Sequence, residues 1–231
     1  MNRGSAKGVR RVVLGVLLAA GTCLSASACA APTRGALWAT IATCLDPGVA
    51  DYCGRCATPL VETTCGQGRG CGETTEVWAE TREYVAIRDS KMCGCPGEFV
   101  HGLAIPRTQV TGVEDPGRPD GIWQFAWNAG RQRIGDETDL ALAVNPRRLR
   151  SQDQLHVHIV RLLPGARARL AGLAVARVPS LGEVWHAAAR SAASAGMKEY
   201  GVLVARDPEG GFLVRVEEGS PEKMYTRYRC R

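Results

Sequence analysis

The sequence lacks an apolar run long enough to cross a bilayer comfortably. The run near its start, residues 12–20, falls short of the length of about 20 residues that a spanning helix needs. Residues 1–29 also lack any acidic side chain: residues 1–11 are basic, and the stretch after the apolar run is rich in small side chains. This order is typical of an export signal. We therefore expect residues 1–29 to direct export and residues 30–231 to form a single working domain.

The end of this leader contains Cys29 in the stretch Ala-Ser-Ala-Cys. The stretch is a degenerate lipobox, without the usual leucine three residues before the cysteine, and it also holds an A-x-A cleavage site. Lipidation or removal of Cys29 leaves an even number of cysteines in the body, whereas cleavage just before an unlipidated Cys29 leaves an odd one. We favour lipidation and a membrane-associated protein outside the cytoplasm. Free secretion and an uncleaved N-terminal anchor are the alternatives.

The chain has little net charge once the leader is set aside. The formal charge of the whole sequence is +6, but four basic residues belong to the leader, which leaves 25 basic against 23 acidic residues and a net charge of +2. This balance gives no support to nucleic-acid binding. A hydrophobic content of 45% with 23% charged residues is that of a globular domain with a core.

The cysteines of the expected body predict disulfides, because an exported protein meets an oxidising compartment. They are Cys44, Cys53, Cys56, Cys65, Cys71, Cys93, Cys95 and Cys230. Four pairs allow too many connectivities for the sequence to assign any of them. A zinc site formed by the pairs Cys53/Cys56 and Cys93/Cys95 is the competing interpretation. Export argues against free thiolates, so we expect no metal and no other cofactor.

Apolar periodicity predicts a mixed order of strands and helices. Strands are expected at 83–88, 98–110, 138–146 and 154–162, and as a terminal hairpin within 199–218. Helices are expected at 37–44, 120–135, 166–174 and 180–196. In the second helix Asp120 is the expected N-cap and Gly135 the stop, and Trp123 and Trp127 are expected in the core rather than in an acyl or base pocket. Helices that interrupt antiparallel strands predict an α+β fold rather than a doubly wound sheet.

The fourth predicted strand carries two of the four histidines in the chain. Side chains alternate along a strand, so Gln154, His156 and His158 share one face and the intervening aliphatic residues take the other. We expect the aliphatic face to meet the core and the polar face to form an exposed strip. This strip is a plain polar surface, a metal half-site completed by His101 or His186, or a histidine nucleophile with its neighbours.

Hydrogen-bond donors gather within about ten residues before His156. They are a carboxamide, three guanidiniums and a hydroxyl: Asn145, Arg147, Arg148, Arg150 and Ser151. Such groups suit an anionic oxygen, and Arg can bind two oxygens at once. The donors favour phosphate chemistry, with a solvated basic loop as the alternative.

The stretch LAVNPRRLRSQDQLHVHIVRL resembles the signature of the histidine-triad superfamily. More closely, RSQDQLHVHI, EYVAIRD, EFVHGLAIPR, GIWQFAWNAGR and the cysteine near the C-terminus are similar to the CDP-diacylglycerol pyrophosphatase family, over roughly residues 40–231. The resemblance implies a histidine-triad-like antiparallel sheet with packed helices, and the cysteines of the body predict a disulfide-stapled N-terminal segment. It also implies that His156 is the nucleophile and His158 the third histidine of the triad. Gln154 stands where the superfamily has its first histidine.

The implied activity is hydrolysis of the pyrophosphate of CDP-diacylglycerol to CMP and phosphatidate through a covalent nucleotidyl-histidine. The partners are a lipid-linked nucleotide and a membrane surface. The expected substrate contacts are Asn145, Ser151, Gln154, Arg148 and Arg150, of which the two arginines rest on charge alone. A superfamily nucleotidyl hydrolase or transferase with a soluble substrate, a non-catalytic exported lipoprotein and a zinc-dependent hydrolase are the alternatives. The sequence gives no oligomeric state.

Overall fold

The computed structural model describes residues 1, 34–43, 45, 77–92, 95–173 and 175–230. The expected leader with Cys29, and all the body cysteines except Cys95 and Cys230, lie outside the described residues. Residues Pro32–Arg231 form one compact unit. Among the residues described, no helix combines the length and apolarity that a membrane span requires.

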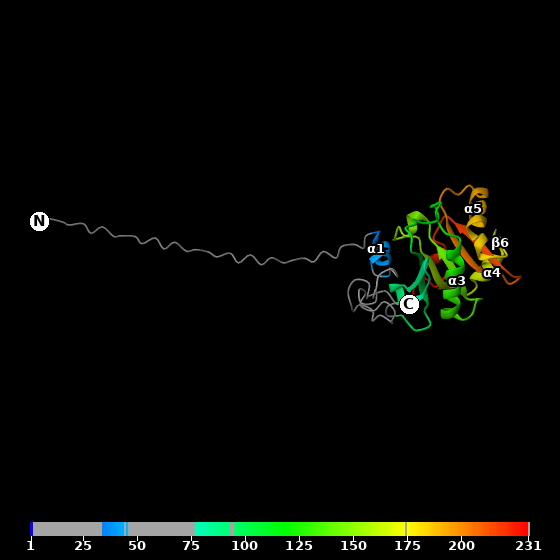
Figure 1. Ribbon diagram of the computed structural model, residues 1–231, viewed down its shortest axis with the longest axis horizontal. Coiled ribbons are helices and arrows are strands. Elements are labelled where there is room, and N and C mark those ends of the chain that lie inside the picture. The colour runs from blue at the N-terminus through cyan, green and yellow to red at the C-terminus, as the bar shows by residue number, and fades with distance from the viewer. Residues whose placement is uncertain (2–33, 44, 46–76, 93–94, 174, 231) are drawn as a thin grey trace. The chain divides into compact units, whose positions relative to one another are not determined.

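The described part of the chain forms one antiparallel sheet with helices packed against it (Figure 1). The strand order is β1-β2-β3-β5-β4-β7-β8-β6. Its strands are β1 Val77–Glu80, β2 Tyr84–Arg88, β3 His101–Pro106, β4 Leu140–Val144, β5 Val157–Arg161, β6 Ala176–Val178, β7 Gly201–Arg206 and β8 Phe212–Glu217. The helices are α1 Ala36–Thr43, α3 Gly121–Ile134, α4 Ala166–Ala171, α5 Val184–Ser194 and α6 Pro221–Tyr225. Short 3-10 turns are Ser90–Met92, Arg147–Leu149 and Leu181–Glu183. The predicted α+β class is confirmed, whereas β1, β6 and α6 were not predicted.

Helices α3 and α5 cover one face of the sheet. Their side chains Trp123, Trp127 and Trp185 pack in a core with Val157 and Ile159 of β5. The rings of Trp123 and Trp185 meet edge to face with centroids 4.6 Å apart, an arrangement that adds about 0.5–1.5 kcal/mol beyond area burial. The expected core role of Trp123 and Trp127 is confirmed.

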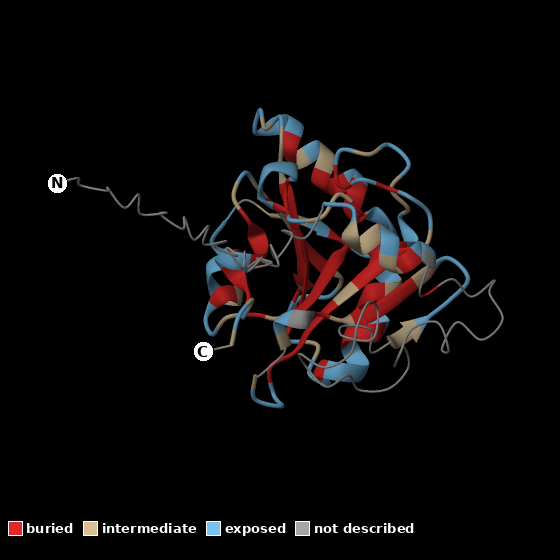
Figure 2. Ribbon diagram, turned by 90° about the vertical axis from the view of Figure 1, so that its left-hand side faces the viewer, coloured by how far each residue is buried: buried red, intermediate tan, exposed pale blue. Residues whose placement is uncertain are grey.

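Helices α1, α4 and α6 lie against the opposite face. Leu170 of α4 and Tyr225 of α6 pack with Val160 of β5, and Ile41 of α1 packs with Val85 of β2. Figure 2 shows the consequence: the strands are buried along most of their length, and exposed residues gather in loops and on the outer sides of helices. Because both faces are covered, polar residues in the central strands are also enclosed.

Helix α3 ends where the sequence predicts. Gly135 adopts a φ of 74°, a conformation that favours glycine, and its N–H donates to the carbonyl of Arg131. Within the helix, a Cβ at Gly130 would come 2.7 Å from Cδ1 of Leu140, so glycine permits the close approach of the helix to the sheet. Asp120 stands at the predicted N-cap position, but its side chain makes no capping hydrogen bond.

Helix α5 begins without a side-chain cap on its backbone. Ser180 donates to the carboxylate of Glu183 at 3.1 Å, but its side chain caps no backbone N–H. A 3-10 turn, Leu181–Glu183, precedes the α-helix instead.

The Sγ atoms of Cys95 and Cys230 lie at disulfide distance, with their Cα atoms 5.6 Å apart. The pair ties the C-terminal segment to the connection between β2 and β3. A Cys95 held in this pair is not available as a thiolate, so the proposed four-cysteine zinc site is wrong as a set. Its other three members lie outside the described residues.

Candidate active site

The histidine-bearing face of β5 is buried rather than exposed. The alternation is as predicted, since Leu155, Val157 and Ile159 enter the core beneath α3. His156 and His158, however, are only 7% and 4% exposed. The expected exposed strip is therefore wrong, because α6 and the neighbouring strands cover this face of the sheet.

His101 belongs to the same cluster. Strand β3 pairs with β5 so that His101 lies opposite Val160 and Leu103 opposite His158, which places both histidines on one face. Nε2 of His101 lies 3.0 Å from Nδ1 of His158, and His101 has no exposed surface. In the sequence, His101 is only one of two unconnected candidates. The other, His186, is exposed on α5.

The position of His156 fixes the tautomer of its ring. Nδ1 lies 2.7 Å from the backbone carbonyl oxygen of Gln154, which can only accept a hydrogen bond. The ring proton is therefore assigned to Nδ1, and Nε2 carries the lone pair. Burial lowers the pKa of His156, although the Gln154 carbonyl opposes this shift. The result is a neutral imidazole with an available Nε2, which is the form that attacks an electrophile.

The side chain of Gln154 holds the segment that follows β3. Its Nε2 donates to the carbonyl oxygens of Pro106 at 3.0 Å and Thr108 at 2.8 Å, and its Oε1 accepts from the N–H of Val110 at 3.3 Å. The glutamine amide has two N–H donors and an acceptor oxygen, whereas a neutral imidazole has one donor and one acceptor. A histidine at this position could not make all three bonds. Substrate contact by Gln154 stays a prediction.

The amide of Asn145 is also fully engaged. Oδ1 accepts from the hydroxyl of Ser220 at 2.6 Å, which directs Nδ2 toward Oε2 of Glu222 at 2.6 Å and Nε2 of His158 at 3.4 Å. Asn145, directly after β4, thus joins this strand to Ser220 and Glu222 at α6. Phosphate binding by Asn145 stays a prediction.

A family model described as CDP-diacylglycerol pyrophosphatase matches residues 73–191, just over half of the 231 residues. The chain belongs to the CDP-diacylglycerol pyrophosphatase family. The resemblance stated from the sequence is therefore confirmed at the level of the family. The matched segment holds His101, Asn145, His156 and His158, while Glu222 lies beyond it.

Relatives of the CDP-diacylglycerol pyrophosphatase family align with a shorter part of the chain. The CDP-diacylglycerol pyrophosphatase of Mycobacterium tuberculosis (strain ATCC 25177 / H37Ra) is 35% identical over 78 residues, 29% of this chain and 30% of the relative. That of Yersinia pestis is 35% identical over 79 residues, 30% of this chain and 31% of the relative. A probable CDP-diacylglycerol pyrophosphatase of Mycobacterium leprae (strain TN) is 38% identical over 73 residues, 27% of each chain. The alignments thus span less than a third of these relatives.

Glu222 closes the site of this CDP-diacylglycerol pyrophosphatase family member from α6. Its carboxylate is 2% exposed and lies 2.6 Å from Nζ of Lys91 and 3.3 Å from Nε2 of His101. Asp89 adds a second carboxylate oxygen 3.4 Å from the same His101 atom. A buried carboxylate is costly unless it is paired, and here Lys91 supplies the pair. Nothing in the sequence around Glu222 or Lys91 indicates this role, so both were missed.

Burial and neighbouring charges together shift the pKa values of the cluster. Burial alone would raise the pKa of Glu222, but Lys91, His101 and Asn145 hold this pKa below its usual value. Burial lowers the pKa of His101, against the attraction of Asp89 and Glu222. The pKa of His158 is well below its usual value, chiefly through burial and then through the neighbouring histidines and Lys91.

The same cluster includes atoms of the kind that bind metal ions. One ligand atom each from Asp89, His101 and His158 lies within 4.8 Å of the others. Carboxylate and imidazole would suit zinc. The ammonium group of Lys91 already lies beside both carboxylates, 2.6 Å from Glu222 and 3.9 Å from Asp89. Side chains of the chain itself therefore balance these charges, and the absence of a metal stays a prediction.

The structure brings Arg150 close to His156. Arg150 lines a small cavity, too narrow to hold a water molecule, together with Asn145 and His156, and its guanidinium bonds to the carboxylate of Glu114 at 2.6 and 2.9 Å. Its Nε has no hydrogen-bond partner among the described residues.

The other two predicted contacts of the basic loop do not line this cavity. Arg148 is exposed, and its Nη2 donates to the carbonyl of Glu218 at 2.6 Å. Ser151 is also exposed. Their contact with substrate stays a prediction.

Proposed function

We propose that this protein hydrolyses CDP-diacylglycerol to CMP and phosphatidate, and that His156 is its nucleophile. The proposal is supported by membership of the CDP-diacylglycerol pyrophosphatase family and, above all, by the hydrogen bond from His156 Nδ1 to the Gln154 carbonyl. That bond keeps the lone pair on Nε2. The antiparallel sheet, with His158 on β5 and His156 directly before it, fits the histidine-triad-like arrangement expected from the sequence.

The reaction proceeds by two displacements at one phosphorus. Nε2 of His156 bonds to the cytidylyl phosphorus, the bond from this phosphorus to the bridging oxygen breaks, and phosphatidate leaves with the electron pair. Water then attacks the same phosphorus, the nitrogen–phosphorus bond breaks, and CMP leaves as the water releases its proton. His156 returns to its neutral form, so no oxidant, reductant or second substrate is consumed.

Arg150 stabilises the negative charge that moves across the phosphate oxygens. In the free protein its guanidinium binds Glu114, and the substrate phosphate takes the place of this carboxylate. Asn145, Ser151, Gln154 and Arg148 complete the set of expected contacts. Of these, Asn145 acts through its hold on Glu222.

The lipid part of the substrate places the reaction at a membrane surface. The expected export signal at 1–29 and the expected lipidation of Cys29 support an anchored protein outside the cytoplasm. The test of this location is metabolic labelling with an azide-bearing fatty acid. Label on the full-length protein that is lost in Cys29→Ser supports the anchor, and unlabelled protein in the culture medium contradicts it.

The activity is tested by CMP release from CDP-diacylglycerol in detergent micelles, with full-length protein and its His156→Ala variant, each with and without a chelator. Release that resists the chelator and disappears in the variant is expected. In water labelled with ¹⁸O, the label should enter CMP and not phosphatidate. An alkaline quench during turnover should retain the cytidylyl phosphorus on the protein. Turnover of CDP-glycerol in preference to the lipid would favour the soluble-substrate alternative, and no turnover of either would favour a non-catalytic protein.

A further inference from the structure

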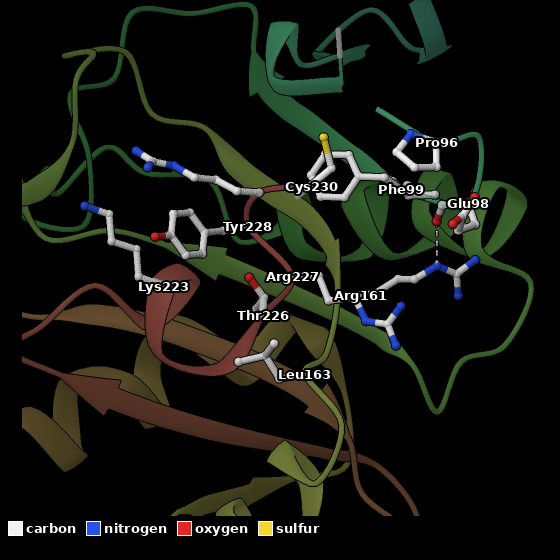
Figure 3. Close-up of a pocket in the computed structure, with 12 residues that line it drawn as sticks. Pro96, Glu98, Phe99, Arg161, Leu163, Lys223, Thr226, Arg227, Tyr228 and Cys230 are labelled. Atoms are coloured by element: carbon white, nitrogen blue, oxygen red, sulfur yellow. Dashed lines mark hydrogen bonds between the residues drawn. The ribbon is translucent and has the colours of Figure 1, made fainter. Parts of the chain in front are cut away.

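A second cavity, of about 410 Å³, lies outside the small space beside His156. It is lined by residues just before β3, by the end of β5, and by the C-terminal segment from α6 to Cys230 (Figure 3). The two cavities share no lining residue. The catalytic chemistry proposed above therefore leaves this cavity without a role.

The inner wall of the cavity is apolar. Phe99, Val100 and Leu163 line it, and Figure 3 shows Pro96, Phe99 and Cys230 gathered at one end. Phe99 and Val100 are largely buried, whereas Leu163 keeps part of its surface open to the cavity. Binding of an apolar ligand to such a wall is favourable, because it removes apolar surface from water.

The rim of the cavity is basic. Arg161, Lys223, Arg227 and Arg229 line it, against the single acidic lining residue Glu98. The backbone N–H of Arg227 donates to the carbonyl of Arg161 at 2.8 Å, and Arg161 donates from Nε to the backbone carbonyl of Glu98 at 3.3 Å (Figure 3). Four cations around one opening are a marked concentration in a body with a net charge of only +2, and they complement an anionic ligand.

The cavity adjoins the histidine cluster. Lys223 follows Glu222 on α6, and the ring of Phe99 lies 6.2 Å from that of His101 between centroids. Arg161 is three residues beyond His158, a separation of about 10 Å along a strand. The elements that hold the cluster thus continue directly into the walls of the cavity.

We propose that this cavity binds one acyl chain of an anionic glycerophospholipid, with the basic rim facing the phosphate end of the lipid. The lipid is the substrate or product of the reaction proposed above, so its identity rests on that proposed function. An apolar wall suits the methylene chain, and the cationic rim suits a phosphate. The volume lies within the range of cavities that hold small ligands, about 300–1,000 Å³. It accommodates part of one chain and leaves the second chain outside.

Binding is tested without turnover, by calorimetric titration of the full-length protein with dioctanoyl phosphatidate at concentrations below micelle formation. Leu163→Trp fills the cavity from a partly exposed position and buries no new charge. Each methylene that is expelled costs about fourfold in affinity, so the variant should bind at least about tenfold more weakly. The matched control is Arg190→Ala on the exposed side of α5, which should bind as the unmodified protein does.

The rim is tested separately with the double variant Lys223→Ala and Arg227→Ala, both at exposed positions. It should weaken phosphatidate binding by about tenfold at low salt, and the loss should shrink as salt rises. For both variants, unchanged CMP release from CDP-glycerol shows that the fold and the reactive centre are intact. Hydrolysis of dioctanoyl CDP-diacylglycerol should show a raised KM with little change in kcat.

Equal phosphatidate affinity in the protein and Leu163→Trp would overturn the assignment, as would the absence of binding. A rim variant that loses only its attachment to anionic vesicles, with unchanged affinity for monomeric lipid, would assign the basic residues to membrane contact and likewise overturn it. Phosphatidate binding that depends on Leu163, in a protein that hydrolyses no CDP ester, would refute the proposed hydrolysis and keep the lipid cavity. The two proposals therefore fail by different measurements.

Discussion

Nε2 of His101 lies 3.0 Å from Nδ1 of His158, although 57 residues separate them in the chain. Only one proton fits between two ring nitrogens at this distance. Carboxylate oxygens of Glu222 and Asp89 lie 3.3 and 3.4 Å from the same His101 atom, so we assign the proton to Nε2 of His101. His158 then accepts at Nδ1 and carries its own proton on Nε2, which faces Glu222 at 3.5 Å. The pair fixes the orientation of the ring that stands beside His156.

Replacement of His101 should disable the reaction without removing the nucleophile. His101→Leu leaves Nδ1 of His158 without its partner, and kcat for CMP release should fall by about 10²-fold or more, in the range of effects of positioned proton donors. His101→Gln keeps a donor toward His158 and should retain more activity than His101→Leu. Thermal unfolding of both variants provides the control for folding. Full activity in His101→Leu would show that the pair is structural only.

The reaction should remain active to a lower pH than a histidine of ordinary pKa would allow. Burial lowers the pKa of His156 from its ordinary value of 6.5, so the neutral nucleophile persists to more acidic pH than a free imidazole would. We expect kcat/KM for CMP release to remain constant on acidification through 6.5 and to fall only below it. An acid limb centred above 6.5 would contradict this environment for the nucleophile. The profile is measured with a monomeric lipid, which avoids changes in micelle charge.

Glu222 should make the protein sensitive to acid. Its folded-state pKa is lowered from 4.5, so its contribution to stability is fully present above 4.5 and is lost as pH falls through the folded pKa. Glu222→Gln removes this contribution and leaves the ammonium group of Lys91 without its 2.6 Å partner. Because that group is partly exposed, we expect a loss of about 1–3 kcal/mol at pH 7. Urea unfolding across pH should show a weaker acid dependence in the variant.

A double-mutant cycle isolates the pair from the rest of the cluster. Lys91→Met alone should lower the free energy of unfolding. The double variant Lys91→Met with Glu222→Gln should lose less free energy of unfolding than the sum of the losses in the two single variants. Additive losses would show that Lys91 and Glu222 do not interact in the folded protein.

The sequence predicts local structure well where one strand or helix determines it. Alternation along β5 places Leu155, Val157 and Ile159 in the core and the two histidines together on the other face. That face is buried because α6, a short helix without an apolar repeat, lies across it. Alternation within one strand carries no information about such a cover.

The contacts of β5 with distant segments could not be predicted from the sequence for the same reason. His101 meets His158 only because β3 pairs with β5, while α3 and β4 intervene between them in the chain. Glu222 comes from still further along, beyond the segment that the family model matches. Pairing of distant segments depends on the whole fold, so the composition of the histidine cluster could not be read from the motif alone.

Gln154 should matter for the loop rather than for attack on phosphorus. Gln154→Ala leaves the carbonyls of Pro106 and Thr108 and the N–H of Val110 without their partners, and an unsatisfied buried group costs about 1–3 kcal/mol. Gln154→His restores the histidine of the superfamily but not these three bonds. We expect both variants to lose stability, and amide exchange to accelerate at Val110. A Gln154→His variant as stable as the unmodified protein would contradict this role.

Arg150 and Glu114 offer the sharpest test of substrate entry. Substrate phosphate has to replace the carboxylate that bonds to Arg150 at 2.6 and 2.9 Å, so Glu114 competes with substrate for the same guanidinium. Glu114→Gln weakens the competitor and should lower KM by about two- to fivefold, consistent with the loss of a partly exposed ion pair. Arg150→Lys keeps the charge but loses the two-pronged contact, and should lower kcat/KM by at least about tenfold. The comparison uses CMP release from a monomeric lipid, with Arg190→Ala as the control for a lost surface charge. A raised KM in Glu114→Gln would mean that the carboxylate organises Arg150 for substrate instead of competing with it.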